Sequence, residues 1–254
     1  MKYALCLRGI SYLTRTYRGS DIPFTIDFSL TYKLIKENII DDLEKEGHQV
    51  DVFYDTYDTP KLEEYISYLN PKSVNIKQFD PNVGDGNYPH IVRIWSDVLY
   101  LALKYQEKNS IEYDYFITTR FDFLIFEKIT NLFIPHDAVS AALKGDDIFT
   151  IIPKIIVKPF LEILNEMFYK RTVSHRFMDL LIEKGYKCHL FYYVYKYDKY
   201  LRNWPLHRNI RNVFIDNNHP FKEYNLEDLY KSSSDCYIYT YKPCKTYNLV
   251  EYEN

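Results

Sequence analysis

Glycine is scarce in this chain, with only 7 among 254 residues. The glycine-rich patterns that hold phosphate groups on backbone amides are missing as well. There is no GxGxxG, which argues against a dinucleotide-binding Rossmann site, and no GxxxxGK[ST], which excludes P-loop ATPases. There is also no GxSxG, so the nucleophile elbow of an α/β-hydrolase is not supported. If a protein with so few glycines binds a diphosphate, it must use side-chain cations or a metal ion.

Cysteine and long apolar runs are also sparse. The four cysteines are Cys6, Cys188, Cys236 and Cys244. No CxxC pair or Cys/His cluster has zinc spacing, so we expect no structural zinc, and reduced thiols in a cytosolic compartment. The apolar run at the N-terminus is too short for a signal peptide and is interrupted by Arg8. No window approaches about 18 uninterrupted apolar residues, so we expect a cytoplasmic protein without a membrane span.

The charge balance and the residue usage narrow the class of protein. A net charge of -3 argues against a general nucleic-acid binder, which usually has a basic face. The contents of 46% hydrophobic and 26% charged residues are those of an ordinary globular domain. Aromatic residues are abundant, with 27 Tyr and 16 Phe, a usage that fits an AT-rich genome. Most of these tyrosines should be half-buried packing residues, and the alternative is that some form sugar-stacking platforms.

The first half of the chain alternates strand and helix patterns. Short apolar segments alternate with segments whose apolar residues recur at helical spacing. The predicted strands are 3–9, 49–54, 73–80 and 113–119; the predicted helices are 25–46, 61–69 and 91–108; residues 10–23 are predicted to form a loop. This order is typical of a parallel sheet covered by helices on both faces, with right-handed crossovers.

The second half is less regular, and it contains no repeat or linker. We predict strands near 139–143, 148–152 and 186–198, a late strand at 235–241, and helices at 155–169 and 174–185. The absence of a linker favours one domain over residues 1–254.

Charged residues stand where three of the predicted strands end. Arg8 closes the first strand, Asp55 follows the second, and Arg120 with Asp122 follows the fourth. The carboxyl ends of parallel strands share one edge of a sheet, and ligands bind outside that edge. Residues two apart on an extended chain face the same side, so Arg120 and Asp122 can meet one ligand. A carboxylate there can hold Mg²⁺ or Mn²⁺ on a phosphate, and an arginine can add a bidentate contact.

A structural role is the alternative for these charges. Arg120 could form an ion pair with Asp122 or with Asp114 that closes the strand, with no ligand involved.

Three local patterns in the first half resemble those of a glycosyltransferase of the GT-A type. They are ALCLRG, VDVFYDTYD and YDYFITTRFDFLIF, and the last is similar to the YD–R-x-D form seen in a group of bacterial and giant-virus enzymes. The resemblance implies a GT-A-like, Rossmann-like α/β fold: a mostly parallel sheet flanked by helices in a single domain. Residues 1–126 would bind the nucleotide sugar, and residues 127–254 would bind the acceptor.

The resemblance also implies an activity and its requirements. The protein would move a sugar from a nucleotide-sugar donor to a glycan or protein hydroxyl, assisted by Mn²⁺ or Mg²⁺. Its partners would be the nucleotide sugar and the acceptor, without nucleic acid. Its location would be the cytoplasm, which would be the host cytoplasm for a viral protein.

Residue roles follow from the same resemblance. Asp122 matches the last carboxylate of the DxD metal motif. Arg120 stands where the family has the first Asp, a departure in which a cation would partly replace the metal ion. Arg8 and Gly9 would line the nucleotide pocket, and Asp55 would approach the base or the ribose.

Four further residues are candidates, each with a plainer alternative. Arg93 matches a phosphate-facing or sugar-facing position, or is a solvated helix residue. Asp147, and less favourably Asp146, could be the base that deprotonates the acceptor hydroxyl. Glycine followed by two aspartates is also ordinary turn chemistry. His219 could be a late metal ligand, or a solvated histidine in an Asn-rich loop.

Two rival functions use the same residues. A nucleotidyltransferase acting on sugar phosphates would also place carboxylates at strand ends, but it normally has a lysine- or glycine-rich phosphate loop. A non-catalytic binding module would keep the strand-end charges for structural reasons alone.

Overall fold

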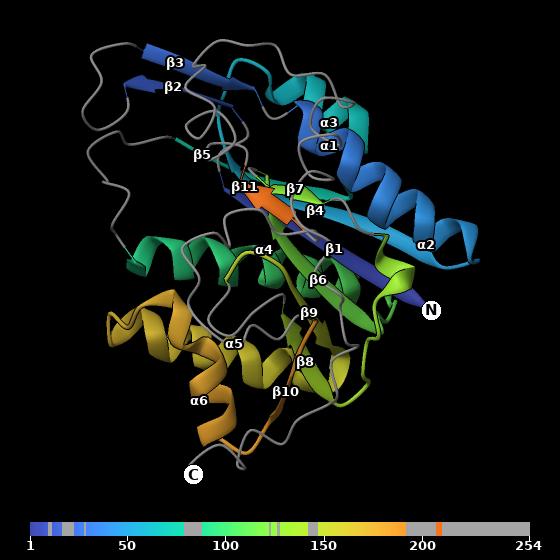
Figure 1. Cartoon of the computed structure of the whole chain (residues 1–254), viewed down its shortest axis with the longest axis vertical. Coiled ribbons are helices and arrows are strands. Elements are labelled where there is room, and N and C mark those ends of the chain that lie inside the picture. The colour runs from blue at the N-terminus through green and yellow to red at the C-terminus, as the bar shows by residue number, and fades with distance from the viewer. Residues whose placement is uncertain are drawn as a thin grey trace, which may run out of the picture.

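A seven-stranded mixed sheet forms the centre of the computed structural model (Figure 1). The structure describes residues 1–9, 12–16, 23–27, 29–78, 88–121, 123–125, 128–141, 147–191 and 207–209. In spatial order the strands are β10 (Lys187–Leu190), β8 (Ala138–Ala141), β9 (Thr150–Pro153), β6 (Tyr115–Arg120), β1 (Lys2–Gly9), β4 (Gln49–Tyr57) and β5 (Ser73–Lys77). All neighbouring pairs are parallel except those that β9 makes with β6 and β8. The predicted fold class, a mostly parallel α/β sheet flanked by helices, is confirmed.

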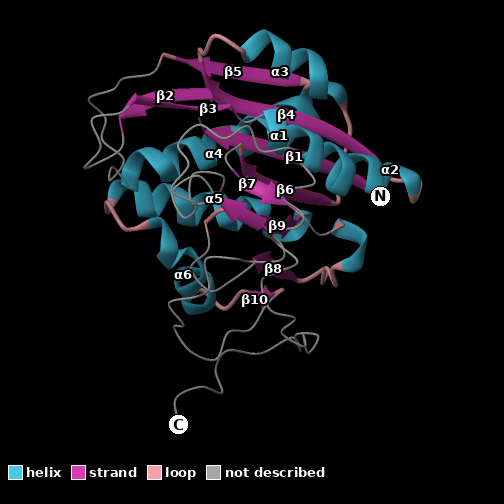
Figure 2. Cartoon of the chain, turned by 45° about the horizontal axis from the view of Figure 1, so that its top comes forward, coloured by secondary structure: helices cyan, strands magenta, loops and turns pink. Residues whose placement is uncertain are grey.

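Helices cover both faces of this sheet (Figure 2). The first face carries α1 (Ser29–Ile35), a π-helical turn η1 (Lys36–Ile40), α2 (Asp41–Lys45) and α3 (Leu62–Leu69). The second face carries α4 (Tyr88–Asn109), α5 (Lys154–Tyr169) and α6 (Phe177–Glu183). Short 3-10 turns, η2 (Ile129–Asn131) and η3 (Ser174–Arg176), complete the helical segments of the described residues.

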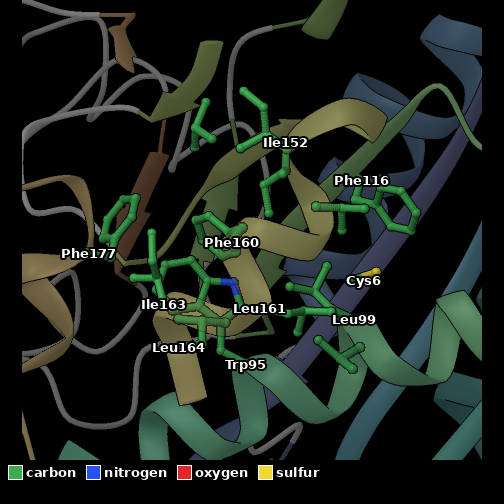
Figure 3. Close-up of a cluster of buried hydrophobic side chains, with 14 of the residues drawn as sticks. Cys6, Trp95, Leu99, Phe116, Ile152, Phe160, Leu161, Ile163, Leu164 and Phe177 are labelled. Atoms are coloured by element: carbon green, nitrogen blue, oxygen red, sulfur yellow. The ribbon is translucent and has the colours of Figure 1, made fainter. Parts of the chain in front are cut away.

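Side-chain alternation along the central strands builds a core on each face. In β1, Leu5 and Leu7 pack on the first face, whereas Ala4 and Cys6 pack on the second. Because β1 lies between β4 and β6 and is covered on both faces, its sequence is a nearly continuous apolar run. On the second face the rings of Trp95 from α4, Phe160 from α5 and Phe177 gather into one cluster, shown in Figure 3.

The segment predicted as a loop at 10–23 contains strand structure instead. Strands β2 (Tyr12–Thr16) and β3 (Pro23–Asp27) pair in antiparallel fashion. The helix predicted to begin near residue 25 therefore begins at Ser29. Residues 23–27 alternate apolar and polar side chains, a period of two that suits a strand, and the helical spacing begins only after them.

The second half matches its predicted elements, but one strand runs in the opposite direction. Strands β8, β9 and β10 and helices α5 and α6 lie within or close to the predicted ranges. Strand β9 is antiparallel to β6, with Thr118 opposite Thr150. Strands from both halves of the chain thus hydrogen-bond within one sheet. Strand β7 (Phe123–Ile125) pairs with β11 (His207–Asn209), and the strand predicted at 235–241 lies outside the described residues.

Two of the four cysteines lie in the described part of the chain. Cys6 and Cys188 are buried free thiols, and Cys236 and Cys244 lie outside the described residues. Among the helices of the described residues, none combines the length and the apolar character needed to cross a bilayer.

Candidate functional site

Three of the predicted site residues lie side by side at the carboxyl edge of the sheet. In the parallel register, Arg8 of β1 is opposite Asp55 of β4 on one side and opposite Arg120 of β6 on the other. Equivalent positions on neighbouring strands point to the same face, here the face that α4 covers. We call Arg8, Asp55 and Arg120 the charged row.

Arg8 is the centre of the row and is held from several sides. Its residue surface is 2% exposed, and its guanidinium carbon lies 4.6 Å from the centroid of the Trp95 ring. Its Nη2 donates a hydrogen bond to the main-chain oxygen of Asp147. The Trp95 indole in turn donates to Thr118 Oγ1 over 3.0 Å, so the ring beneath the guanidinium is fixed. The guanidinium therefore has a defined orientation without any ligand.

Asp55 is fully buried, and its carboxylate binds a lysine that the sequence analysis did not single out. Lys77 Nζ lies 2.8 Å from Asp55 Oδ2 and 2.9 Å from Asp97 Oδ2, and Asn75 donates to Asp55 over 3.3 Å. Burial raises the pKa of Asp55 to about 6, although the bond to Lys77 opposes the shift. Strand β4 runs on to Tyr57, so Asp55 lies inside the strand and not after it. Asp55 itself has no exposed surface. Its predicted role at the base or the ribose stays a prediction.

The charge network continues onto helix α4. Arg93 Nε lies 3.0 Å from Asp97 Oδ1, one helical turn away, and its guanidinium carbon is 5.7 Å from the Phe168 ring. Its side chain is 54% exposed. This is the geometry of a solvated helix residue that packs toward α5, and a role at a phosphate or a sugar stays a prediction.

The other end of the row is more open. Arg120 is half-buried, and its guanidinium carbon lies 5.2 Å from the Phe123 ring. The main-chain nitrogen of Phe121, the residue after Arg120, donates to the Arg8 carbonyl over 3.3 Å. Gly9 has a φ of +102°, a conformation that favours glycine, and its carbonyl accepts a hydrogen bond from Thr56. These contacts determine how the chain leaves β1 and β6 at the edge.

The remaining predicted residues are divided between the site and the undescribed segments. Asp147 is buried and meets the row through its main-chain oxygen, because antiparallel β9 begins at the edge where β6 ends. Asp122, Asp146 and His219 lie outside the described residues. Within the described ranges no group of three or more His, Cys, Asp or Glu is placed to hold a metal ion.

Lys77 is the residue that sequence reasoning missed, and a signal for it existed. Asn75 and Lys77 alternate along the predicted strand at 73–80, so they share the face on which Asp55 lies in the neighbouring strand. Like the residues of the charged row, Lys77 stands at the carboxyl end of a strand that is parallel to its neighbour.

Comparisons with known proteins give a distant likeness of fold. No family model matches the sequence, and no curated protein matches it. Among solved structures, it is similar to the crystal structure of a glycosyltransferase involved in the glycosylation of the major capsid of PBCV-1. The identity is 11%, the TM-score is 0.39, and the match covers 74% of this chain and 80% of that chain. A likeness this distant carries no weight for function.

Proposed function

We propose that this protein is a glycosyltransferase that moves a sugar from a nucleotide-sugar donor to a hydroxyl of a glycan or protein. The donor diphosphate binds at the charged row, between Arg8 and Arg120. The observation that supports this most directly is that two arginines occupy equivalent positions on adjacent parallel strands, at the carboxyl edge. Ligands of open α/β sheets bind at that edge, and guanidinium groups suit bidentate contact with phosphate oxygens. The sequence resemblance to GT-A enzymes rests on the same segments.

The described residues suit an anion better than a metal ion. The carboxylate of the row, Asp55, is bound to Lys77, and the row and Lys77 together carry three cations against one carboxylate. These side chains do not make a donor set for Mn²⁺ or Mg²⁺, which prefer carboxylate, phosphate and water oxygens. A metal requirement rests on Asp122 as predicted from the sequence, with His219 as the second predicted ligand.

We place the nucleoside and the reacting hydroxyl on opposite sides of the charged row. The nucleoside would lie toward β4 and β5, where Lys77 is the partly exposed member of its pair with Asp55. The reacting hydroxyl of the acceptor would lie toward β9, where Asp147 follows the undescribed segment 142–146. Asp147 is then the candidate base that takes the proton of the acceptor hydroxyl.

A thermal-shift screen with UDP-, GDP-, CMP- and dTDP-sugars, with and without Mn²⁺, tests the donor site. A donor present at 100 times its Kd should stabilise the protein by about 2.7 kcal/mol. Arg120→Met should weaken that binding by about 10- to 100-fold, because bonds from a charged group contribute about 1.5–3 kcal/mol. Arg176→Met is the matched control, since Arg176 is exposed and pairs with Glu183 away from the row.

Transfer is measured with the donor found in this way, as release of the nucleotide in the presence and absence of acceptor glycans. Asp122→Ala should abolish it while the protein remains folded. If no nucleotide sugar stabilises the protein, or if Arg120→Met binds the donor like the control, the proposal is wrong. Pyrophosphate release from an NTP and a sugar phosphate would instead indicate a nucleotidyltransferase.

A further inference from the structure

A groove lies between α1 and α3, on the sheet face opposite the charged row. Its volume is about 440 Å³, within the range of about 300–1,000 Å³ that is usual for ligand sites. The lining residues are Tyr32, Lys33, Glu64, Tyr65, Ser67 and Tyr68. Three of the six are tyrosines, and none of them takes part in the donor site described above.

The floor of the groove is aromatic and closely packed. Tyr32 and Tyr65 are 2% and 1% exposed, and their ring centroids are 4.3 Å apart. Tyr54 donates a hydrogen bond to the Tyr65 carbonyl over 3.2 Å, which ties α3 to the sheet beneath it. A ligand would meet a surface that is already ordered, so little conformational entropy is lost there on binding.

The rim is polar and its charges balance. Lys33 comes from α1, and Glu64 and Ser67 come from α3; all three are exposed. In the described part of the chain, none of these three side chains makes a hydrogen bond or an ion pair. Tyr68 stands beside them, 45% exposed. One cation, one carboxylate and one hydroxyl offer both donors and acceptors without a net charge.

We infer that this groove binds a neutral oligosaccharide, as a subsite for the distal part of an acceptor glycan. A sugar ring has an apolar C–H face that can cover the Tyr68 ring and hydroxyls that both donate and accept, which matches this rim. A peptide fits less well: groove-bound helices need a continuous apolar groove, and extended peptides need a free strand edge. The assignment of the glycan as an acceptor rests on the proposed transferase function.

The groove is connected to the donor edge through one residue. Phe121 lies between Arg120 and Asp122 in the sequence, and its main-chain nitrogen donates to the Arg8 carbonyl. Its ring is 5.7 Å from Tyr32 and 5.1 Å from Tyr54, centroid to centroid. The floor of the groove therefore packs directly against the segment that carries the donor-side charges. This contact is why we assign the groove to the acceptor of the same reaction.

The test is binding of the full chain to an array of neutral and acidic glycans without donor. We expect retention on neutral glycans, and about tenfold weaker retention of Tyr68→Ala, the size of effect typical of one exposed aromatic contact. Tyr169→Ala is the matched control, because Tyr169 is an 81% exposed tyrosine at the end of α5 and lies outside the groove. The melting temperature of each variant verifies that it is folded.

Several results would overturn the inference. These are retention of no glycan, equal retention of Tyr68→Ala and the wild type, or preference for unglycosylated peptides over glycans through Tyr68. Failure of the donor site is separable: Arg120→Met should lose nucleotide-sugar binding and keep glycan binding. Tyr68→Ala should keep donor binding and raise the KM for the acceptor alone.

Discussion

Asp55→Asn should change how the stability of this protein depends on pH. Asp55 has no exposed surface, and burial raises the pKa of its carboxyl from an ordinary 3.8 to about 6 even with Lys77 bound. Asparagine has nearly the same shape and does not titrate. The difference in unfolding free energy between wild type and variant therefore isolates the titration of this one group.

The sign and the size of the change in unfolding free energy follow from the raised pKa of Asp55. Between pH 3.8 and about 6 the folded state holds the Asp55 proton more tightly than the unfolded state does, so stability falls as the pH rises through that window. A shift of about two pKa units at 1.36 kcal/mol each gives a loss of about 3 kcal/mol. About two thirds of that loss should occur between roughly pH 4.5 and 7.5. The wild type should thus lose about 2 kcal/mol relative to the variant across this range.

Urea unfolding followed by tryptophan fluorescence, at half-unit steps of pH, measures this difference. Other carboxylates contribute equally to both proteins and cancel. Asp137→Asn is the control: Asp137 is exposed, and its ion pair with Lys187 lowers its pKa, so its difference curve should be nearly flat over the same range. A pH-independent difference for Asp55→Asn would refute the buried carboxyl with a raised pKa at this end of the charged row.

Three other substitutions test buried polar side chains, one without a hydrogen-bond partner in the described part of the chain and two with one. His189 is 2% exposed, and within the described part of the chain neither ring nitrogen has a hydrogen-bond partner, so His189→Phe should stabilise the protein by about 1–2 kcal/mol. Because burial lowers the His189 pKa, the gain in thermal-melt experiments should grow below about pH 6.5. Thr118→Val removes the acceptor of the Trp95 indole and should lower the unfolding free energy by about 1–3 kcal/mol in urea titrations, with a changed tryptophan emission. Tyr113→Phe removes the 2.8 Å bond to buried Asp51 and should lower stability by about 1–2 kcal/mol; an unchanged midpoint would contradict that bond.

The order of elements in the first half could be predicted because its signals are local. Short apolar strands and amphipathic helices alternate there, and parallel strands necessarily bring their carboxyl ends to one edge. The amino-acid sequence alone therefore predicts that Arg8, Asp55 and Arg120 lie close together. The pairing of β2 with β3 gave no comparable signal, since no Asn-Gly or Asp-Gly turn marks it.

The direction of β9 and the pairing of Asp55 with Lys77 could not be predicted in the same way. Strand β9 has four residues, Thr150–Pro153, and its antiparallel direction depends on its pairing with β6 and β8 and not on its own residues. The pairing of Asp55 with Lys77 likewise depends on the register of β4 against β5, which sequence patterns do not specify. The groove between α1 and α3 depends on how two helices lie on the sheet, so its lining residues had no sequence signature.

The placement of β9 beside β6 has a consequence for dividing the chain. A fragment ending near residue 126 would keep β1, β4, β5 and β6 but lose the strand that hydrogen-bonds to the outer side of β6. Phe116 and Ile117, which are buried in the whole protein, would then lie on an edge strand. The outer main-chain groups of an edge strand have no partner and can pair with a strand of another molecule. We therefore expect an isolated fragment of residues 1–126 to aggregate, and co-expression with residues 127–254 to restore its solubility.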